Sequence, residues 1–373
     1  MIYLDYSANT PADENVLKRF VEIEQQFIGN PNSHHAAGEA ARCEMMKITD
    51  SIAAQLGVEP SEIIYTSGAS ESNNLAIKGI ARASRHIGKH IISTALEHSS
   101  VSGCLTFLQE QGYEIDLVDI QQDGTVSLEH LAELMRKDTV LVAVCAVDSE
   151  LGTVQPIRKI AEIVKQYPQC RIHVDATQAV GKTDLCFEGV DTLSISPHKF
   201  YGLNGCGLLF KRKGLIIEPL IHGGVSTTIY RSGTPALALA ASTEVALKRV
   251  LSAQNENIAA VQKSNAFLKK ALSAYPKVRF NSPQNAVPHI LNLSVTGTRG
   301  SAFQQALDKH GVCVSVKSAC SVENTPSRAV FAVSRDRKNA LASWRISLSH
   351  LTTQDELEEF LKIFEICYKE VTS

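Results

Sequence analysis

The run Val140-Leu141-Val142-Ala143-Val144-Cys145-Ala146-Val147 is almost continuously apolar. A strand in a sheet with helices on both faces has this pattern, because neither set of alternating side chains meets water. Shorter runs of the same kind occur on both sides, at Ile63–Thr66, His90–Thr94, Arg171–Asp175 and 193–196. Segments of helix length, such as 157–166, lie between several of these runs. This alternation predicts parallel βαβ units in an α/β domain.

The pattern changes from about residue 235. The stretch 236–274 is rich in Ala, Leu, Lys and Glu and contains no proline, so it predicts one or two long helices. Further on, Thr353-Gln354-Asp355-Glu356 is a capping box, and the apolar residues after it follow helical spacing. We therefore predict a large domain over 15–250, a smaller C-terminal α/β domain over 251–373 and an N-terminal segment, 1–14, packing with the smaller domain.

The composition argues against several classes of protein. The 373 residues are 44% hydrophobic and 20% charged, which suits a globular protein with room for two domains. A formal net charge of -2 offers no basic surface for nucleic acid, and no apolar run approaches the roughly 18 residues of a membrane span. The first residues lack the features of a signal peptide. We therefore expect a cytoplasmic protein with no direct nucleic-acid partner and no membrane partner.

The nine cysteines are scattered along the chain. None forms Cys-x-x-Cys, and no group of His and Cys has the spacing of a zinc site. Their odd number and the expected reducing compartment argue against a disulfide framework. We predict that most are small buried apolar residues, and we predict no metal site.

Two charged residues stand at the ends of predicted strands. Lys199 follows the run 193–196, a position from which its amine could form a Schiff base with an aldehyde cofactor. On its own, Lys199 is better explained as a surface lysine. Asp175 ends the run Arg171–Asp175, and a pyridine-ring cofactor needs such an anion to keep its ring nitrogen protonated. On its own, Asp175 could equally be a helix cap.

A third segment suits an anion. Thr66-Ser67-Gly68-Ala69-Ser70-Glu71-Ser72-Asn73 follows a predicted strand and opens a helix. Its small residues let backbone N–H groups approach a phosphate, which the helix dipole also favours. Gly202-Leu203-Asn204-Gly205-Cys206-Gly207 does not match a dinucleotide fingerprint and is interpreted as a tight turn.

A series of short motifs carries a family resemblance in its order and spacing. They are Tyr3-Leu4-Asp5-Tyr6-Ser7-Ala8, Gly29-Asn30-Pro31-Asn32-Ser33, the 66–73 segment, Glu97-His98, His173-Val174-Asp175-Ala176-Thr177-Gln178, Ser196-Pro197-His198-Lys199, Arg231-Ser232-Gly233-Thr234, Ser318-Ala319-Cys320 and Trp344-Arg345-Ile346-Ser347-Leu348. Over nearly its whole length the chain resembles the cysteine desulfurases, within the class V aminotransferases. The resemblance implies the pyridoxal phosphate (PLP) fold type I, in which helices flank a mainly parallel sheet and a smaller domain follows.

The resemblance also implies roles for residues at the cofactor. Lys199 would form the Schiff base and move the substrate Cα proton, and His98 would stack on the ring and serve in acid–base steps. Asp175 would pair with the ring nitrogen, and Gln178 would bond the ring hydroxyl. The phosphate would be held by Ala69, Ser70, Ser196 and His198, with Thr234 from the neighbouring subunit of a homodimer.

For the substrate, the resemblance implies that Asn30 and Arg345 bind the carboxylate of L-cysteine, Arg345 as a bidentate clamp. Cys320 would accept the sulfur of L-cysteine and so carry a persulfide, and the rest of the substrate would become L-alanine. A thiolate is the nucleophile suited to this attack, and the stretch after Cys320 is expected to form an exposed, mobile loop. The sulfur would then pass to a protein acceptor, either an iron–sulfur scaffold or a thiolation enzyme.

The chain departs from the family pattern at three places. The usual Asn-Asn-Glu is Asp148-Ser149-Glu150, the usual charged Gln-Glu-Arg segment is replaced within 225–230, and Lys317 occupies a usual glycine position. We expect PLP binding and sulfur abstraction to survive these changes, with rate, substrate range or acceptor specialised. The alternatives are a selenocysteine lyase or another PLP-dependent C–S lyase on this scaffold, and a sulfur-relay scaffold without catalysis.

Overall fold

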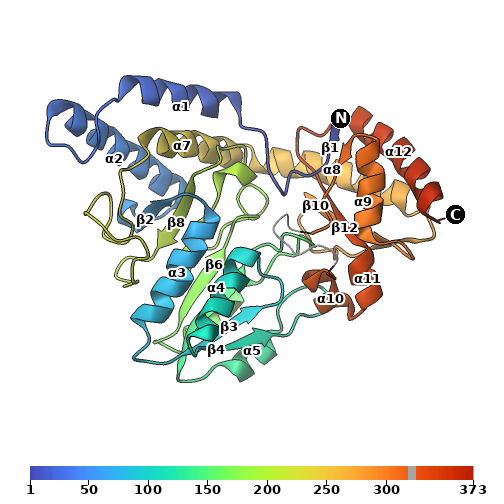
Figure 1. Cartoon of the computed structure of the whole chain (residues 1–373), viewed down its shortest axis with the longest axis horizontal. Coiled ribbons are helices and arrows are strands. Elements are labelled where there is room, and N and C mark those ends of the chain that lie inside the picture. The colour runs from blue at the N-terminus through green and yellow to red at the C-terminus, as the bar shows by residue number, and fades with distance from the viewer. Residues whose placement is uncertain (318–324, 373) are drawn as a thin grey trace.

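The computed structural model describes residues 1–317 and 325–372, and Figure 1 shows two packed parts. The larger part contains a seven-stranded sheet in the order β2-β8-β7-β6-β5-β3-β4. Its strands are β2 (Ile63–Thr66), β3 (His90–Thr94), β4 (Glu114–Val118), β5 (Thr139–Cys145), β6 (Arg171–Asp175), β7 (Thr192–Ile195) and β8 (Gly207–Lys211). Only β8 runs antiparallel to its neighbours. The predicted mainly parallel α/β sheet is therefore confirmed.

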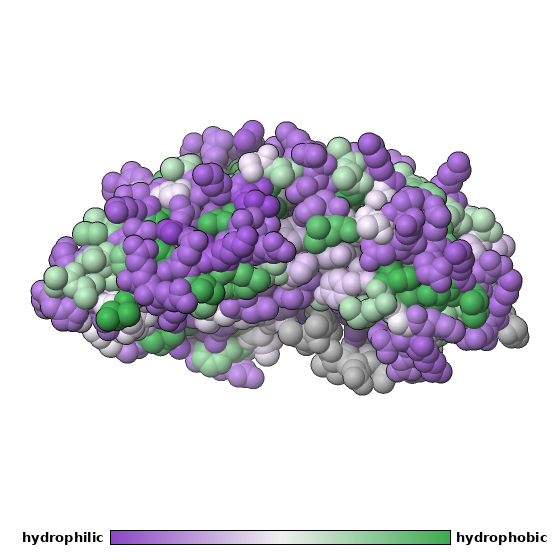
Figure 2. All heavy atoms as spheres, turned by 90° about the horizontal axis from the view of Figure 1, so that it is seen from above, coloured by the Kyte–Doolittle hydropathy of each residue, from purple (hydrophilic) through white to green (hydrophobic). Residues whose placement is uncertain are grey.

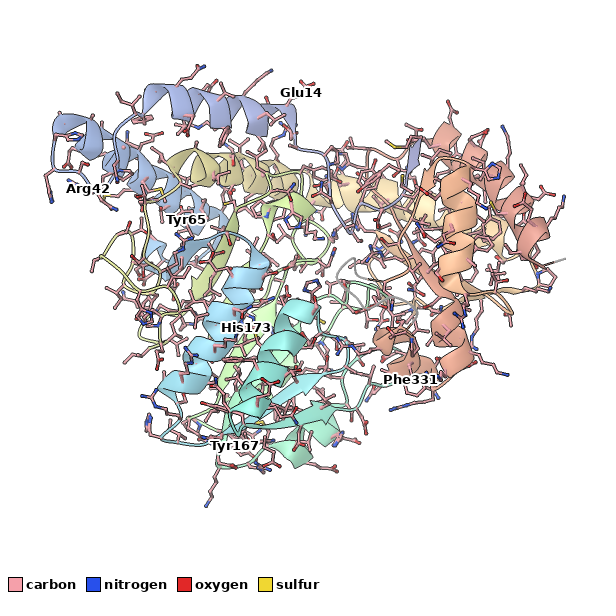
Figure 3. All side chains as sticks on the ribbon, in the orientation of Figure 1. Glu14, Arg42, Tyr65, Tyr167, His173 and Phe331 are labelled. Atoms are coloured by element: carbon pink, nitrogen blue, oxygen red, sulfur yellow. The ribbon has the colours of Figure 1, made fainter. Side chains whose placement is uncertain are left out.

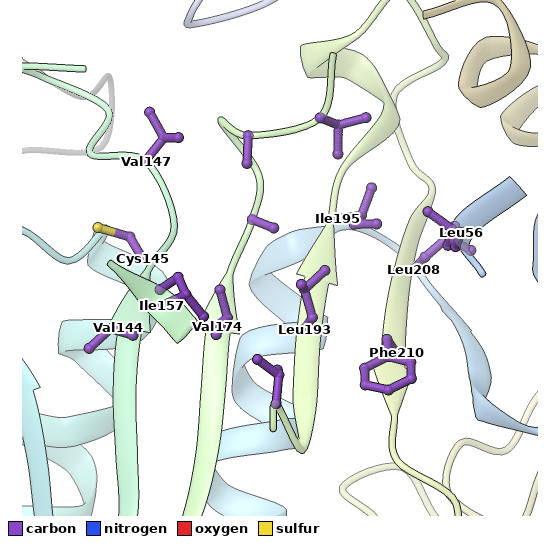
Figure 4. Packing of buried hydrophobic residues seen from close by; sticks show 14 of the residues in the cluster. Leu56, Val144, Cys145, Val147, Ile157, Val174, Leu193, Ile195, Leu208 and Phe210 are labelled. Atoms are coloured by element: carbon purple, nitrogen blue, oxygen red, sulfur yellow. The ribbon is translucent and has the colours of Figure 1, made fainter. Parts of the chain in front are cut away.

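Helices cover both faces of this sheet. Along β5, Leu141 and Ala143 belong to the core on one face, while Val142 and Val144 belong to the core on the other. The first face packs against α3 (Ala69–Ala83) and α4 (Ser99–Glu110). The second packs against α1 (Glu14–Gln26), α2 (Ala36–Leu56), α5 (Leu128–Leu134), α6 (Ile157–Val164) and α7 (Leu237–Ser252). Figure 4 shows the row of side chains from Val144 to Phe210 across this second face.

The smaller part is built on an antiparallel sheet in the order β12-β10-β9. Its strands are β9 (Val278–Phe280), β10 (Ile290–Val295) and β12 (Ser343–Ser347). Around them lie α8 (Gln254–Leu272), α9 (Gly300–Lys309), α10 (Arg328–Ser334), α11 (Arg337–Ala342) and α12 (Gln354–Thr372). The rings of Phe303 and Trp344 stack in its core with centroids 5.1 Å apart. The predicted capping box forms, since Thr353 and Glu356 exchange hydrogen bonds at the start of α12.

The N-terminal segment adds to the smaller part. β1 (Ile2–Tyr3) pairs in parallel with β11 (Val312–Cys313), and Leu4 is fully buried in the smaller core. The helical stretch 236–274 divides into α7 and α8 at Ala253. This junction supports our proposal of a boundary near residue 250. The division is not clean, because Ala329 and Val330 of α10 pack into the larger core.

The surface carries mainly polar and charged residues. The face in Figure 2 is mainly hydrophilic, with apolar residues in separate patches. Among the described residues, no helix combines the length and the apolar character that a membrane crossing needs.

Gly207 fixes how closely β8 approaches the start of α3. A Cβ placed on Gly207 would lie 2.5 Å from the Cα of Gly68, a backbone atom that no side-chain rotation can move. We predict that Gly207→Ala lowers the free energy of unfolding by about 1–3 kcal/mol. The control is Gly103→Ala, inside α4, where an added Cβ meets nothing within 4 Å. It should raise stability by about 0.5–1 kcal/mol. Denaturant unfolding measures the free energy of unfolding of both variants. A Gly207→Ala protein as stable as the wild type would contradict the prediction.

Candidate active site

A cavity of about 360 Å³ lies where the carboxyl ends of β5, β6 and β7 meet the first turns of α3 and α4. Ligands of open α/β sheets bind at this edge, and the volume lies within the range of small-molecule sites. The cavity is lined by all but two of the residues predicted for the site in the described part of the chain, namely Ala69, Ser70, His98, Asp175, Gln178, Ser196, His198, Lys199 and Arg345.

Lys199 closes a 3-10 turn, Pro197–Lys199, that follows β7 directly. Its Nζ donates hydrogen bonds to the backbone carbonyls of Ser7, at 2.7 Å, and Ala8, at 2.6 Å. The N-terminal segment therefore reaches across to the amine. The sequence placed Ser7 and Ala8 in a motif but gave no reason to expect their carbonyls beside Lys199.

Asp175 is the last residue of β6 and is 6% exposed. Its Oδ1 accepts from the Thr177 backbone N–H at 2.9 Å, and its Oδ2 accepts from Asn73 Nδ2 at 2.9 Å. A carboxylate has about four acceptor positions, so Asp175 can still receive a ring N–H. The Thr177 hydroxyl oxygen is buried without a partner among the described residues, and Thr177 lines the same cavity.

The first turn of α3 offers backbone donors to an anion. Gly68 is its N-cap with φ +154°, a region that favours glycine, and Ala69 and Ser70 follow. Ser196 Oγ lies 2.9 Å from His198 Nδ1 on the adjacent turn. Burial lowers the pKa of His198 to about 4, so this histidine is neutral and has a single ring N–H to offer an anion.

His98 caps α4 with its side chain. Its Nδ1 accepts from the Ser100 backbone N–H at 3.1 Å and lies 2.9 Å from Ser100 Oγ. Burial lowers its pKa below the usual histidine value, and the nearby charges of Lys199 and Arg328 act in the same direction. A neutral His98 can lie against an aromatic ring.

Gln178 is already held at both ends of its amide. Its Nε2 donates to the Ser7 carbonyl at 2.8 Å, and its Oε1 accepts from Lys182 Nζ at 2.6 Å. One N–H of the amide is left over for a ring hydroxyl, and the proposed role of Gln178 is compatible with this geometry.

Arg345 is buried at 1% exposure and joins the two ends of the chain. It forms an ion pair with Asp5 at 2.8 Å and donates to the Ser149 carbonyl at 2.8 Å. Its Nε has no partner among the described residues. Arg345 lines the cavity, and each of its two Nη groups keeps a second N–H that a carboxylate could accept, so its predicted role is compatible with this geometry. Residue 149, a departure from the family pattern, contacts Arg345 through its backbone, which serine preserves.

Three predicted site residues are not placed in the cavity. Asn30 and Thr234 are exposed and do not line it, and Asn30 Oδ1 accepts from the Asn32 backbone. Thr234 was predicted to contact the phosphate of the neighbouring subunit, which a single chain does not test. The role of Thr234 and the substrate-binding role of Asn30 therefore stay predictions. Cys320 lies outside the described residues. Within the described residues no cluster of metal ligands occurs, and the eight cysteines described there are free thiols.

Two buried carboxyls lie beside the cavity. Glu97 Oε1 accepts from Thr94 Oγ1 and the Cys145 N–H, while its Oε2 has no partner among the described residues. Burial raises the pKa of Glu97 to about 8, and it raises the pKa of Asp148 to about 7. Neither carboxyl was assigned a role from the sequence.

Glu97 should make stability depend on pH. Its pKa is raised on folding, so between roughly pH 4.5 and 8 the folded protein binds more protons than the unfolded chain. Stability is therefore full at the acid end of this window and falls as pH rises, by roughly 1–4 kcal/mol for this group. Glu97→Gln cannot titrate, so its denaturation midpoint should fall less between pH 5 and 8. Glu110→Gln, on the exposed end of α4, should keep the wild-type profile. Parallel profiles for wild type and Glu97→Gln would refute this.

The site combines a lysine amine, a buried carboxylate and a helix N-terminus around one cavity. This combination defines the kind of site that holds an aldehyde cofactor with a pyridine ring and a phosphate. The family model for aminotransferase class-V matches residues 2–360. The chain belongs to this family, whose members depend on PLP.

Similar proteins cover nearly the whole chain. The chain is 36% identical to a protein named cysteine desulfurase IscS from Dictyoglomus turgidum, over 98% of this chain and 93% of the relative. It is 35% identical to a NifS/IcsS protein homolog from Lactobacillus delbrueckii subsp. bulgaricus, over 99% and 97%. A solved NifS-like protein matches with a TM-score of 0.92 and 34% identity, covering 98% of each chain. A structure described as SspA in complex with cysteine matches with a TM-score of 0.83 and 31% identity, covering 95% of this chain and 100% of that one.

Proposed function

We propose that this protein is a PLP-dependent cysteine desulfurase that converts L-cysteine to L-alanine and carries the sulfur on Cys320. The observation that carries the proposal is the convergence of Lys199, Asp175 and the first turn of α3 on one cavity. Membership of the class-V family and the relatives named cysteine desulfurase support it.

The residues present fit the cofactor. Lys199 would hold the aldehyde carbon, Asp175 the ring nitrogen and Gln178 the ring hydroxyl, while Ala69, Ser70, Ser196 and His198 would surround the phosphate. The orphaned hydroxyl of Thr177 beside Asp175 is a further buried polar group that a bound ligand would satisfy. When bound, PLP supplies an electron-withdrawing ring that stores electrons released on the substrate carbons.

The remaining roles belong to side chains of this chain. Arg345 would bind and orient the carboxylate of L-cysteine, held in place by Asp5. Lys199 Nζ would take the Cα proton and return it. His98 would lie on the ring and exchange a proton with the substrate, and the buried walls around Cys145 and Leu96 would limit water.

Sulfur leaves by transfer to a thiolate. Cys320 would attack the substrate sulfur, so that an S–S bond forms as the Cβ–S bond breaks. The Cβ then takes up a proton, which completes L-alanine. The persulfide on Cys320 would be passed to a protein acceptor, for which an iron–sulfur scaffold or a thiolation enzyme remains our proposal.

A homodimer is also proposed. The segment before Thr234 exposes Val225 at 76% and Ile229 at 66%, where the family pattern has charged residues. Thr234 itself does not reach the cavity of its own chain. A second subunit would cover these apolar side chains and bring Thr234 to the phosphate. The cytoplasmic location stays a prediction.

Isotope labelling tests the reaction. Purified protein with PLP and L-cysteine carrying a heavy sulfur isotope should gain one labelled sulfur on the peptide containing Cys320 and release one L-alanine for each sulfur. Cys43→Ala, at an exposed cysteine, should keep both products, whereas Lys199→Ala should form neither. Peptide mass spectrometry and alanine analysis measure the two products. If the wild type forms no labelled persulfide and no alanine, the proposal is wrong. If Cys320→Ala still releases sulfur at the wild-type rate, the protein is a C–S lyase that releases its product directly.

A further inference from the structure

Asn73 connects several residues of the site through one side chain. It lies on α3, is fully buried and faces β6 and β7. Its Nδ2 donates to Asp175 Oδ2 at 2.9 Å and to Ser100 Oγ at 2.8 Å. Its Oδ1 lies 2.9 Å from His173 Nε2 and accepts from Ser194 Oγ at 2.6 Å. An amide has two N–H donors and two acceptor positions, so all four are used.

The direction of these bonds follows from Asp175. A carboxylate can only accept, so the NH₂ end of Asn73 must face Asp175 and its oxygen must face His173. His173 then donates through Nε2, and its Nδ1 accepts from Thr192 Oγ1 at 2.9 Å. Burial lowers the pKa of His173 to about 4, which agrees with a neutral ring. Figure 3 labels His173 beside α3, the helix that carries Asn73.

Ser100 links Asn73 to His98 by hydrogen bonds whose direction is also determined. Ser100 Oγ accepts a hydrogen from Asn73, so its own hydrogen is available for His98 Nδ1, 2.9 Å away. The Ser100 backbone N–H also donates to this nitrogen. His98 Nδ1 is therefore an acceptor of two hydrogen bonds, and the ring proton is on Nε2.

We propose that Asn73 is a positioning residue that orients the Asp175 carboxylate and, through Ser100, keeps His98 in the neutral form with its proton on Nε2. The use of this arrangement in catalysis rests on the proposed function, but the arrangement itself does not. The Asn73 amide thus fixes the orientation of Asp175, proposed to pair with the ring nitrogen, and the protonation of His98, proposed to lie on the ring face. With Nδ1 occupied, His98 exchanges protons only through Nε2.

The charges around His98 bear on the test. Burial lowers the pKa of His98, Asp175 raises it, and Lys199 and Arg328 lower it further. Arg328 is anchored nearby, since its Nη2 donates to the Glu97 carbonyl at 3.1 Å and to Ser102 Oγ at 3.2 Å. Without Asn73, the Ser100 hydroxyl could turn and accept a proton from His98 Nδ1, so protonated His98 would become more favourable.

The test uses the full chain without added cofactor, with histidines labelled by ¹⁵N. His98→Gln assigns the signal of His98. In the wild type the neutral ring should show its proton on Nε2. The pKa of His98 should rise by roughly 0.5–1 unit in Asn73→Ala, in line with the loss of about one hydrogen bond. Asn73→Asp keeps the shape and the contacts to His173 and Ser194 but cannot donate when ionised, so it should also raise this pKa.

The matched control is Asn74→Asp, the same substitution one residue further along α3. Asn74 donates to the Ser70 carbonyl, and among the described residues it forms no hydrogen bond with Asp175 or Ser100. It should shift the pKa of His98 less than Asn73→Ala does. Unfolding curves show whether each variant is folded, and Ser100→Ala provides a second break in the chain of bonds if Asn73→Ala is not.

Titration of the cofactor gives an independent readout. Asn73→Asp should weaken PLP binding at least tenfold, because its carboxylate repels Asp175, while Asn74→Asp should change binding little. If the folded variants Asn73→Ala, Asn73→Asp and Ser100→Ala all leave the His98 pKa within 0.2 units of wild type, the inference is overturned. If His98 responds as expected but the wild type binds no PLP, the inference stands and the proposed function fails.

Discussion

The parallel pairing of β6 with β7 is the constraint on which the site depends. It aligns Asp175 with Ser194, so both strands end at the same edge of the sheet. The next residues of each strand then turn into the cavity, with Thr177 and Gln178 on one side and Ser196 to Lys199 on the other. A carboxylate and an amine far apart in sequence are thus fixed in one cavity by backbone hydrogen bonds rather than by a flexible loop.

Buried polar groups hold the rest of the site in place. Asn73, His173 and Ser194 are fully buried, and each has a partner that keeps its orientation. An unpaired polar group in such a place would cost roughly 1–3 kcal/mol, so the bonds must form together. The guanidinium of Arg345 is also fixed by buried contacts, since it pairs with Asp5 of the N-terminal segment and donates to the Ser149 carbonyl. The two parts of the chain are thereby held together at the side of the cavity that Arg345 lines.

Much of this could be predicted from sequence. The apolar runs predicted β2, β3, β5 and β6 because these strands are buried, and the capping box predicted the start of α12. Strand β4 was missed because Glu114 and Leu117 are exposed at the sheet edge, so its pattern is weak. The family motifs predicted Lys199, Asp175 and His98. They could not reveal the carbonyls of Ser7 and Ala8 beside Lys199 or the hydrogen bonds of Asn73, because most of these contacts join segments at least 100 residues apart. Asn30 and Thr234 do not line the cavity of the single chain.

We infer that the amine of Lys199 holds the cofactor beside Asp175. Reduction of the PLP-loaded protein with borohydride fixes the cofactor to the lysine that binds it, and peptide mass spectrometry then identifies that residue. We expect one pyridoxyl group per chain, on the peptide containing Lys199. A modified lysine elsewhere in the chain, or a PLP-saturated protein in which Lys199 stays unmodified, would contradict it.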